Sequence, residues 1–494
     1  LKYPVITSHY MVRENFRDLR QPRQRRRSHV ERLVFLVTDA TPRSKSGVAN
    51  DAPKTGWLSR STKLFNMAAR IAGSEMRGRV RGSVGRSLEN FDVLTRVEQA
   101  RIMVEHLGQL KGAVMKAGQL LSIDASDLLP AEAMDVLSRL QSEAEPVAFP
   151  IMAQVLDADL GARRDRLEVH PEPAASASIG QVHRGSFEGH DVAVKIQYPG
   201  IRESIDSDIG ALERVASSFV SVARRQIDLA DTFRELRHIL HLEADYEREA
   251  DNLRRYAAAI AHDARFVVPA PHADVSGPRV LTMDWASGQP LHAWIRSGPS
   301  GVDREGFARA LLDLYCLEFF EWGFVQTDPN HGNYLVADDG RIVLLDLGAA
   351  LEYDTEFRAR YVELLKVIGT QDDARIVQAG VDFELIDARE SDATKAAFAR
   401  LLRSAVEPFL PSRQPFRFRD EDYAQQARVV ARTFTTGLRY SPPPRRLLFL
   451  HRKLGGLFQL LKRLDVTLDL IPYWERMVGT DVRDAPVTPA MAEQ

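Results

Sequence analysis

The sequence is poor in cysteine and in long apolar runs. Its 494 residues include one cysteine, Cys316, which excludes an internal disulfide framework or a zinc site built on several cysteines and is compatible with a reducing compartment. No run of about eighteen apolar residues occurs, so the sequence predicts no transmembrane helix. We expect a globular, cytoplasmic protein whose membrane contacts are peripheral.

Several motifs of common enzyme classes are also absent. The chain contains no P-loop signature, no His-Glu-x-x-His, no Gly-x-Ser-x-Gly and no Gly-x-Gly-x-x-Gly. These absences exclude P-loop NTPases, zincin metalloproteases and α/β-hydrolases.

Positive charge is concentrated at the N-terminus. The net charge is −2, yet residues 1–90 contain 19 Lys and Arg against 7 Asp and Glu. The stretch "RQPRQRRRSH" (20–29) could bind an anionic lipid surface or nucleic acid by charge alone, or belong to a transit peptide. We favour a disordered basic leader over residues 1–56 and expect no nucleic-acid partner.

Hydrophobic periodicity predicts a helical region followed by strands. Apolar residues recur every three or four positions from 57 to 165, where 149–161 reads as a short helix closed by Gly161. The period becomes two over 167–200, which predicts three strands. After a helical stretch at 202–260, residues 266–291 offer two more strands. We expect these five strands to form one small α/β lobe.

The second half reads as a mainly helical lobe. An amphipathic helix is predicted over 302–323, then a hairpin that turns at Asp339-Gly340, then helices from 355 to about 475. The predicted domains are a leader (1–56), a helical extension (57–165), a first lobe (166–290), a second lobe (291–478) and a tail (479–494).

Lys195 ends the strand "VAVK" and requires a partner if it is buried, because an unpaired buried ammonium is costly. Acids follow at Glu243, Asp245, Glu247 and Glu249. Treated as one helix, Glu243 and Glu249 would lie about 120° apart, which implies two cationic partners. Lys116, beside Gly118 and Gln119, is the second candidate. Taken alone, each lysine reads more simply as a solvated side chain.

The segment "PAASASIGQV" (173–182) is rich in small residues and lies where two strands turn. Small side chains let backbone N–H groups approach a phosphate. The candidates for this contact are Ala174, Ala175, Ser176, Ala177 and Ser178. An Ala/Ser linker is the alternative interpretation.

The loop "FVQTDPNHGNYLV" (324–336) carries the strongest local signal. Asp328 and Asn333 have the Asp-x-x-x-x-Asn spacing of a kinase catalytic loop, and Asp346 follows in Asp-Leu-Gly. Asn333 and Asp346 fit as magnesium ligands, with Asp328 facing the transferred phosphoryl group or the nucleophile. An Asx-rich turn beside a hairpin would explain each piece but not their order. We expect a structural role for His331.

Six motifs together resemble the UbiB/ADCK/Coq8 (ABC1) family of atypical protein-kinase-like proteins. They are "KAGQLLSIDASDLLP", "AASASIGQVHRG", "VAVKIQYPG", "EADYEREADN", "QTDPNHGNYLV" and "LLDLGA", spread over roughly residues 90–470. The resemblance implies an α+β, two-lobed protein-kinase-like fold with an N-terminal helical extension. It also implies that Lys116 and Gln119 pack over the active site and pair with Glu243, while Glu249 pairs with Lys195.

The same resemblance implies an adenine-binding hinge at "LTMDWASG", with Met283, Asp284, Trp285 and Ala286. The expected cofactors are ATP and Mg²⁺, and the expected activity is that of an ATPase or phosphotransferase supporting ubiquinone or other prenyl-lipid metabolism. The expected partners are a prenyl lipid or quinone precursor, an anionic membrane surface and lipid-biosynthesis proteins. A nucleotide-gated lipid-binding or scaffolding pseudokinase is the alternative, and a small-molecule kinase of the aminoglycoside phosphotransferase type is a third.

Overall fold

The computed structural model describes residues 146–177, 179–222, 230–328, 330–437, 445–480 and 482. All of them belong to one compact unit, Ala52–Gln494. The predicted leader, most of the predicted helical extension and the predicted residues Lys116, Gly118, Gln119 and Ser178 lie outside the described residues.

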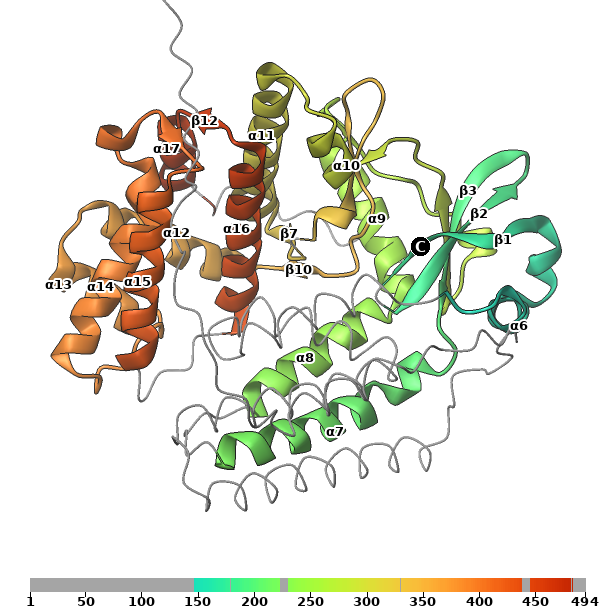
Figure 1. Ribbon diagram of the computed structural model, residues 1–494, viewed down its shortest axis with the longest axis horizontal. Helices are drawn as coiled ribbons and strands as arrows, with labels where there is room; N and C mark the ends of the chain where they lie inside the picture. The colour runs from blue at the N-terminus through green and yellow to red at the C-terminus, as the bar shows by residue number, and fades with distance from the viewer. Residues whose placement is uncertain are drawn as a thin grey trace, which may run out of the picture. The chain divides into compact units, whose positions relative to one another are not determined.

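The first lobe contains a four-stranded antiparallel sheet of order β1-β2-β3-β5, of which Figure 1 labels β1, β2 and β3. Its strands are β1 (Leu167–Ser176), β2 (Gly180–Phe187), β3 (His190–Gln197) and β5 (Val280–Asp284). The β2–β3 hairpin turns at Glu188-Gly189, whose φ angles are 51° and 82°. Two consecutive positive φ values are what a two-residue type I′ turn requires, and they match the twist of the paired strands.

Helix α6 (Phe149–Leu160) packs on this sheet against β3 and β5. Its buried side chains, Met152, Val155, Leu156 and Leu160, recur at helical spacing. Pro150 occupies the first turn, and the helix ends at Gly161 with φ 55°, a conformation that glycine adopts without strain. The predicted helix closed by Gly161 is confirmed.

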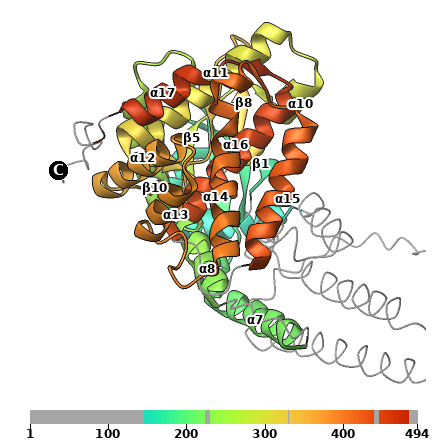
Figure 2. The same cartoon turned by 90° about the vertical axis from the view of Figure 1, so that its left-hand side faces the viewer.

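Three helices follow β3: α7 (Ile201–Val222), α8 (Ala230–Glu243) and α9 (Tyr246–Ile260). Helices α7 and α8 lie side by side (Figure 2). The chain leaves the helix after Glu243, and α9 starts afresh with Asp245 as its N-cap, accepting from the Arg248 amide at 3.1 Å. Glu243 and Glu249 are therefore on two different helices, and the expected 120° separation around one helix is wrong.

A second four-stranded sheet, of order β4-β9-β8-β6, belongs to the other lobe. It comprises β4 (Phe266–Val267), β6 (Gln289–Pro290), β8 (Tyr334–Val336) and β9 (Ile342–Leu344). The β8–β9 hairpin contains the predicted Asp339-Gly340 turn, with Gly340 at φ 85°. Because β4 pairs with β9 rather than with the first sheet, the prediction that five strands form one lobe is wrong.

Helix α10 (Leu291–Arg296) precedes α11 (Gly301–Cys316), which begins at the N-cap Ser300. A π-helical turn, Leu317–Trp322, continues α11 and ends at Gly323 with φ 67°. Strand β7 (Phe324–Gln326) follows directly and pairs with β10 (Ala350–Glu352). The π-helical turn therefore leads straight into the loop that carries Asp328.

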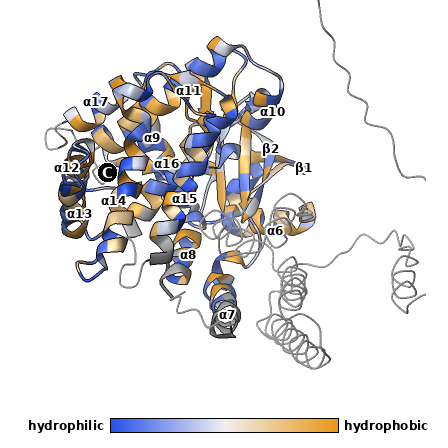
Figure 3. Cartoon of the chain, turned by 60° about the vertical axis from the view of Figure 1, so that its left-hand side comes forward, coloured by the Kyte–Doolittle hydropathy of each residue, from blue (hydrophilic) through white to orange (hydrophobic). Residues whose placement is uncertain are grey.

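The remaining helices are α12 (Thr355–Gly369), α13 (Asp373–Asp382), α14 (Asp392–Val406), α15 (Glu421–Gly437), α16 (Arg445–Leu464) and α17 (Ile471–Gly479). Short strands β11 (Phe416–Arg417) and β12 (Thr467–Leu468) pair beside them. Figure 3 shows apolar and polar residues on the same helices, as expected when one face of each helix is buried. Within the described ranges, no helix is long and apolar enough to cross a membrane.

Candidate active site

Lys195 on β3 lies between two carboxylates. Its Nζ donates to both carboxylate oxygens of Glu249 on α9 at 2.7 Å and lies 3.4 Å from Oδ2 of Asp346. Lys195 and Glu249 are buried, whereas the side chain of Asp346 is 36% exposed. The ion pair predicted between Lys195 and Glu249 is therefore present, and Asp346 joins it from the segment after β9.

The electrostatics keep the Lys195 ammonium charged. Burial lowers the pKa of Lys195, but the carboxylates of Asp346 and Glu249 outweigh this and raise the pKa well above its usual value. Burial raises the pKa of Glu249 to about 7, against the opposing effect of Lys195. The Tyr246 ring, 4.9 Å from Nζ, adds a cation–π contact. A fixed cation beside the half-buried Asp346 is suited to an anionic ligand.

Two side chains of helix α9 also donate hydrogen bonds to backbone carbonyls of the segment after Asp346. Asn252 donates from Nδ2 to the Leu347 carbonyl at 2.8 Å. Arg248 donates to the Gly348 carbonyl at 2.8 Å and also to the Ala350 carbonyl. The helix that presents Glu249 to Lys195 thus fixes the strand-to-loop segment that presents Asp346.

Asp328 and Asn333 are close together at the end of β7. Asn333 Nδ2 lies 3.3 Å from Oδ2 of Asp328 and 3.5 Å from its carbonyl. The backbone N–H of Leu345 donates to the Asn333 carbonyl at 3.0 Å, so the pairing of β8 with β9 places Asn333 opposite Leu345, the residue before Asp346. The loop spacing brings Asp328 to Asn333, and the hairpin brings Asn333 to the segment that carries Asp346.

The donor set at this place suits a magnesium ion that arrives with a nucleotide. Asn333 uses its Nδ2 toward Asp328, which leaves its side-chain oxygen available. Asp346 Oδ1 accepts from the Gly348 amide at 3.0 Å and Oδ2 faces Lys195. Two oxygen ligands fit a magnesium ion whose other ligands are water and phosphate. Among the described residues, no cluster of three or more His, Cys, Asp or Glu could hold a metal alone.

The small-residue segment is mostly strand rather than loop. Ala174, Ala175 and Ser176 belong to β1, are exposed, and follow an irregularity in its pairing with β2. Ala177 forms the turn, where its amide donates to the Gly180 carbonyl at 2.9 Å. The segment lies where two strands turn, as expected, but β1 extends to Ser176 and the turn itself is shorter than the segment.

The predicted hinge residues are at the end of β5. Met283 is buried and pairs with Ala193 of β3, while Trp285 donates its amide to the Asp191 carbonyl at 3.1 Å. Asp284 accepts from the Ala270 amide at 3.2 Å and contacts His272, and Ala286 is half-buried. These residues lead from the first sheet into the second lobe, where a hinge is expected.

Two further side chains lie close to Asp328. Arg452 of α16 has a guanidinium nitrogen 3.6 Å from Asp328 Oδ1, and both side chains are about nine-tenths buried. Glu243, at the end of α8, lines the same small cavity as Asp328, Thr327 and Arg452. With about 10 Å³ of free space, this cavity admits roughly one water molecule. Glu243, predicted to be regulatory, therefore shares a cavity with residues of the catalytic loop.

Arg452 and its neighbour Lys453 are not among the residues predicted from the sequence. One signal was available: α16 buries Leu447, Leu450, Leu457, Leu460 and Leu461. This periodicity places Lys453 on the buried face, where a lysine requires an acid. His331, expected to be structural, has its Nδ1 3.1 Å from Arg463, and burial lowers its pKa to about 4.

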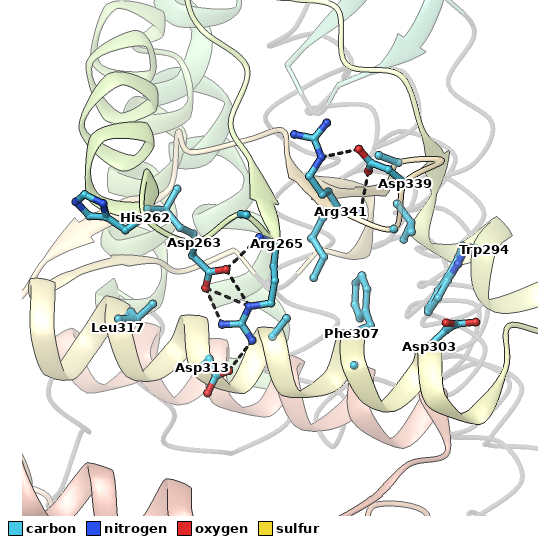
Figure 4. A pocket seen from close by; sticks show the side chains of 18 of the residues that line it. His262, Asp263, Arg265, Trp294, Asp303, Phe307, Asp313, Leu317, Asp339 and Arg341 are labelled. Carbon is cyan, nitrogen blue, oxygen red and sulfur yellow. Dashed lines mark hydrogen bonds and ion pairs between the residues drawn. The ribbon is translucent and has the colours of Figure 1, made fainter.

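A separate hollow of about 1580 Å³ contains none of the predicted site residues. It lies between the end of α9, α11 and the β8–β9 hairpin (Figure 4). Arg265 is held there by Asp263 at 2.6 Å and Asp313 at 2.7 Å, and Arg341 by Asp339 at 2.7 Å. Because these arginines are already paired within the wall, size alone does not mark the hollow as a binding site.

The two lobes and the contacts of Lys195 define a protein of the kinase-like class. The family model for the ABC1 atypical kinase-like domain matches residues 139–380. The chain is 35% identical over 377 residues to "Atypical kinase COQ8B, mitochondrial" of Rattus norvegicus, covering 75% of this chain and 70% of that protein. It is 29% identical over 422 residues to "Atypical kinase COQ8, mitochondrial" of Saccharomyces cerevisiae, covering 83% of each.

The chain belongs to the ABC1 atypical kinase-like family. A solved structure, the complex of Rv3197 with erythromycin from Mycobacterium tuberculosis, superposes with a TM-score of 0.54 at 26% identity and covers 80% of this chain and 100% of that one. The predicted family and the predicted α+β kinase-like fold are both confirmed. The domain boundaries and the assigned role of each site residue stay predictions.

Proposed function

We propose that this protein binds ATP with Mg²⁺ and either hydrolyses it or transfers its terminal phosphoryl group. The observation that carries the proposal is the bridge that Lys195 makes between Glu249 and Asp346, at 2.7 Å and 3.4 Å. A buried lysine oriented by an acid on a neighbouring helix and facing a metal-binding aspartate is the arrangement that positions nucleotide phosphates in kinases.

Each proposed role follows from position and chemistry. Lys195 binds nucleotide phosphates, and Glu249 orients it. Asn333 and Asp346 hold the magnesium ion, which when bound would neutralise charge on the phosphates. The carboxylate of Asp328 orients the attacking oxygen and accepts its proton. Backbone groups from Met283 to Ala286 contact the adenine, and those from Ala174 to Ser178 contact the phosphates.

A second candidate function, that of a nucleotide-gated lipid-binding or scaffolding protein, has one observation in its favour. Asp328 is only 8% exposed and Arg452 lies against it, so an acceptor larger than water has little space. This restriction supports hydrolysis over transfer to a protein, and it also fits a nucleotide-gated lipid-binding or scaffolding protein with weak catalysis. We infer that Glu243, with Lys116, Gly118 and Gln119, regulates access.

The biological setting rests on the family. We propose that the activity supports ubiquinone or other prenyl-lipid metabolism at a membrane surface, together with lipid-biosynthesis proteins. The curated relatives cited above are named as mitochondrial. For this chain, a cytoplasmic location with peripheral membrane contact is our proposal.

The deciding experiment measures Mg²⁺-dependent ATP turnover by the purified protein, with and without anionic vesicles that contain a prenyl lipid. Asp346→Asn is the matched variant, because it keeps the size of the side chain and removes the metal-binding charge. We expect turnover in the wild type that rises with vesicles and is lost in the variant. Nucleotide binding without turnover above Asp346→Asn, under every lipid condition, would support the scaffolding alternative instead.

A further inference from the structure

A buried ion pair lies directly behind the catalytic loop. Glu318, in the π-helical turn Leu317–Trp322, is fully buried, and Lys453 on α16 is 5% exposed. Nζ of Lys453 lies 3.1 Å from one carboxylate oxygen of Glu318 and 3.4 Å from the other. Neither residue touches the proposed nucleotide contacts, so a role for the pair has to act through its neighbours.

Gln326 connects this pair to both halves of the site. Its backbone N–H donates to Glu318 Oε1 at 3.1 Å, and its side-chain oxygen lies 3.5 Å from Nζ of Lys453. Its Nε2 donates to the backbone carbonyl of Asp346 at 3.3 Å. Gln326 is the last residue of β7, two positions before Asp328, so one residue joins the pair to both Asp328 and Asp346.

Two other elements hold the π-helical turn in place. Tyr256 on α9 donates its hydroxyl to Glu318 Oε1 at 2.6 Å. Arg358 on α12, fully buried, donates to the carbonyls of Phe320 and Glu321 at 3.2 Å. Carbonyls at the end of a helix need such partners, and isolated π-helical turns occur frequently at functional sites.

The energetics favour a positioning role over a stabilising one. Removing two charges from water costs about as much as their mutual attraction returns, so apolar residues of the same volume would serve stability equally well. Burial lowers the pKa of Lys453, but Glu318 outweighs this effect and the net pKa is raised, so the Lys453 ammonium stays charged. The pair instead provides directional contacts, because Glu318 accepts from the amide of Gln326 and Lys453 contacts the side-chain oxygen of Gln326.

We propose that Glu318 and Lys453 are positioning residues that set the catalytic loop at Asp328 in register with the metal-binding segment at Asp346. This inference rests on the proposed function, because it assigns the pair to the site that would bind ATP and Mg²⁺. Arg452, next to Lys453 in sequence, contacts Asp328 at 3.6 Å, so α16 reaches the loop at two successive residues.

The test uses the full chain carrying Glu318→Gln and Lys453→Met, singly and together. The double variant removes both charges and keeps a hydrogen-bond acceptor for the Gln326 amide. Its matched control is Glu363→Gln with Lys366→Met, an exposed ion pair of 2.7 Å on α12. Gln326→Met is a second, milder variant that removes only the side-chain contacts to Lys453 and Asp346.

For each protein we would measure thermal unfolding, ATP affinity with EDTA and with Mg²⁺, and kcat and KM of turnover. Displacement of a catalytic group by about 1 Å can cost about a hundredfold in rate. We therefore expect the double variant to lose about 10- to 100-fold in kcat and most of the Mg²⁺-dependent gain in ATP affinity. Affinity without metal should stay within about twofold, and Gln326→Met should change the same two quantities by a smaller factor.

The inference is overturned if the double variant keeps both kcat and the Mg²⁺-dependent gain in ATP affinity within about twofold of wild type. If the double variant does not fold, the same criterion applies to Gln326→Met. Losses that only follow the unfolded fraction would overturn it as well. If the wild type gains ATP affinity with Mg²⁺ but shows no turnover, only the proposed activity is contradicted. The role of Glu318 and Lys453 is then tested by the Mg²⁺-dependent gain in ATP affinity of their variants. A wild type that binds no ATP contradicts both.

Discussion

Arg452 forms an ion pair with Asp328. A helix from the C-terminal part of the chain, α16, therefore contacts the catalytic loop. The guanidinium nitrogen lies 3.6 Å from Oδ1 of Asp328, and the side chains are 9% and 10% exposed. Asn333 Nδ2 lies 3.3 Å from the other oxygen, Oδ2. Asp328 is therefore contacted on both oxygens before any substrate arrives, which limits how freely it can accept a proton.

We expect Arg452→Gln to lower stability and raise turnover. Removing the charge leaves a buried carboxylate with one partner fewer, which costs about 1–3 kcal/mol in the free energy of unfolding. Asp328 becomes more available to water, so kcat should rise several-fold while ATP affinity stays the same. Chemical denaturation and steady-state kinetics measure the two effects. A fall in kcat would show instead that Arg452 assists the reaction.

Arg419→Gln is the matched control for Arg452→Gln. Arg419 pairs with Asp465 at 3.3 Å, but its side chain is 58% exposed. Exposed ion pairs contribute between about 0 and 1 kcal/mol, so stability and kinetics should be nearly unchanged.

The Lys195–Glu249 pair gives a prediction that separates stability from binding. Lys195→Met leaves Glu249, which is fully buried, without its cationic partner. Breaking one side of a buried pair costs about 3–5 kcal/mol, whereas replacing both partners is close to neutral. Adding Glu249→Gln should therefore restore most of the stability but none of the ATP affinity. Denaturation and calorimetric ATP titration of both variants would test this.

Lys366→Met controls for the loss of a lysine as such, because Lys366 pairs with Glu363 at the surface. If the variant that combines Lys195→Met with Glu249→Gln regained ATP affinity, Lys195 would not be a phosphate ligand. If it stayed as unstable as Lys195→Met, the destabilisation would come from lost packing rather than from an unpaired charge.

Local chemistry made much of the site predictable. The Asp328–Asn333 spacing, the strand that carries Lys195 and the Asp339-Gly340 turn depend on short-range rules, and the structure has the contact, the strand and the turn at these residues. The Lys195–Glu249 pairing came from the resemblance to the family. It crosses from β3 to α9, a contact that periodicity does not specify.

The features missed from the sequence are two contacts between residues far apart in the chain and one local helix break. Strand β4 has two residues, and its pairing with β9 rather than with the first sheet is decided by the packing of the second lobe. The helix break at Asp245 was overlooked although aspartate is a common N-cap, because the apolar pattern continues across it. Arg452 lies far along the chain from Asp328, and only the folded chain shows their contact.

The buried histidine of the first sheet predicts how stability depends on pH. His183 on β2 is fully buried, with Nδ1 2.7 Å from the His170 carbonyl and Nε2 2.8 Å from Gln181. Burial lowers the pKa of His183 below 6.5, against the opposing effect of the His170 carbonyl. As the pH falls through about 6.5, the unfolded chain binds this proton before the folded chain does, so the free energy of unfolding decreases.

We expect the thermal unfolding midpoint of the wild type to decrease as the pH is lowered from 7.5 to 5.5. His183→Phe should reduce this slope without abolishing it, because burial also lowers the pKa of His331 and of His451 to about 4. At pH 7.5 the variant should be less stable by about 1–3 kcal/mol, because Gln181 and the His170 carbonyl lose a buried partner. His190→Phe, on the exposed start of β3, is the control and should keep the wild-type slope. An unchanged slope in His183→Phe would show that other groups set the acid sensitivity, since the buried imidazole is the group that this substitution removes.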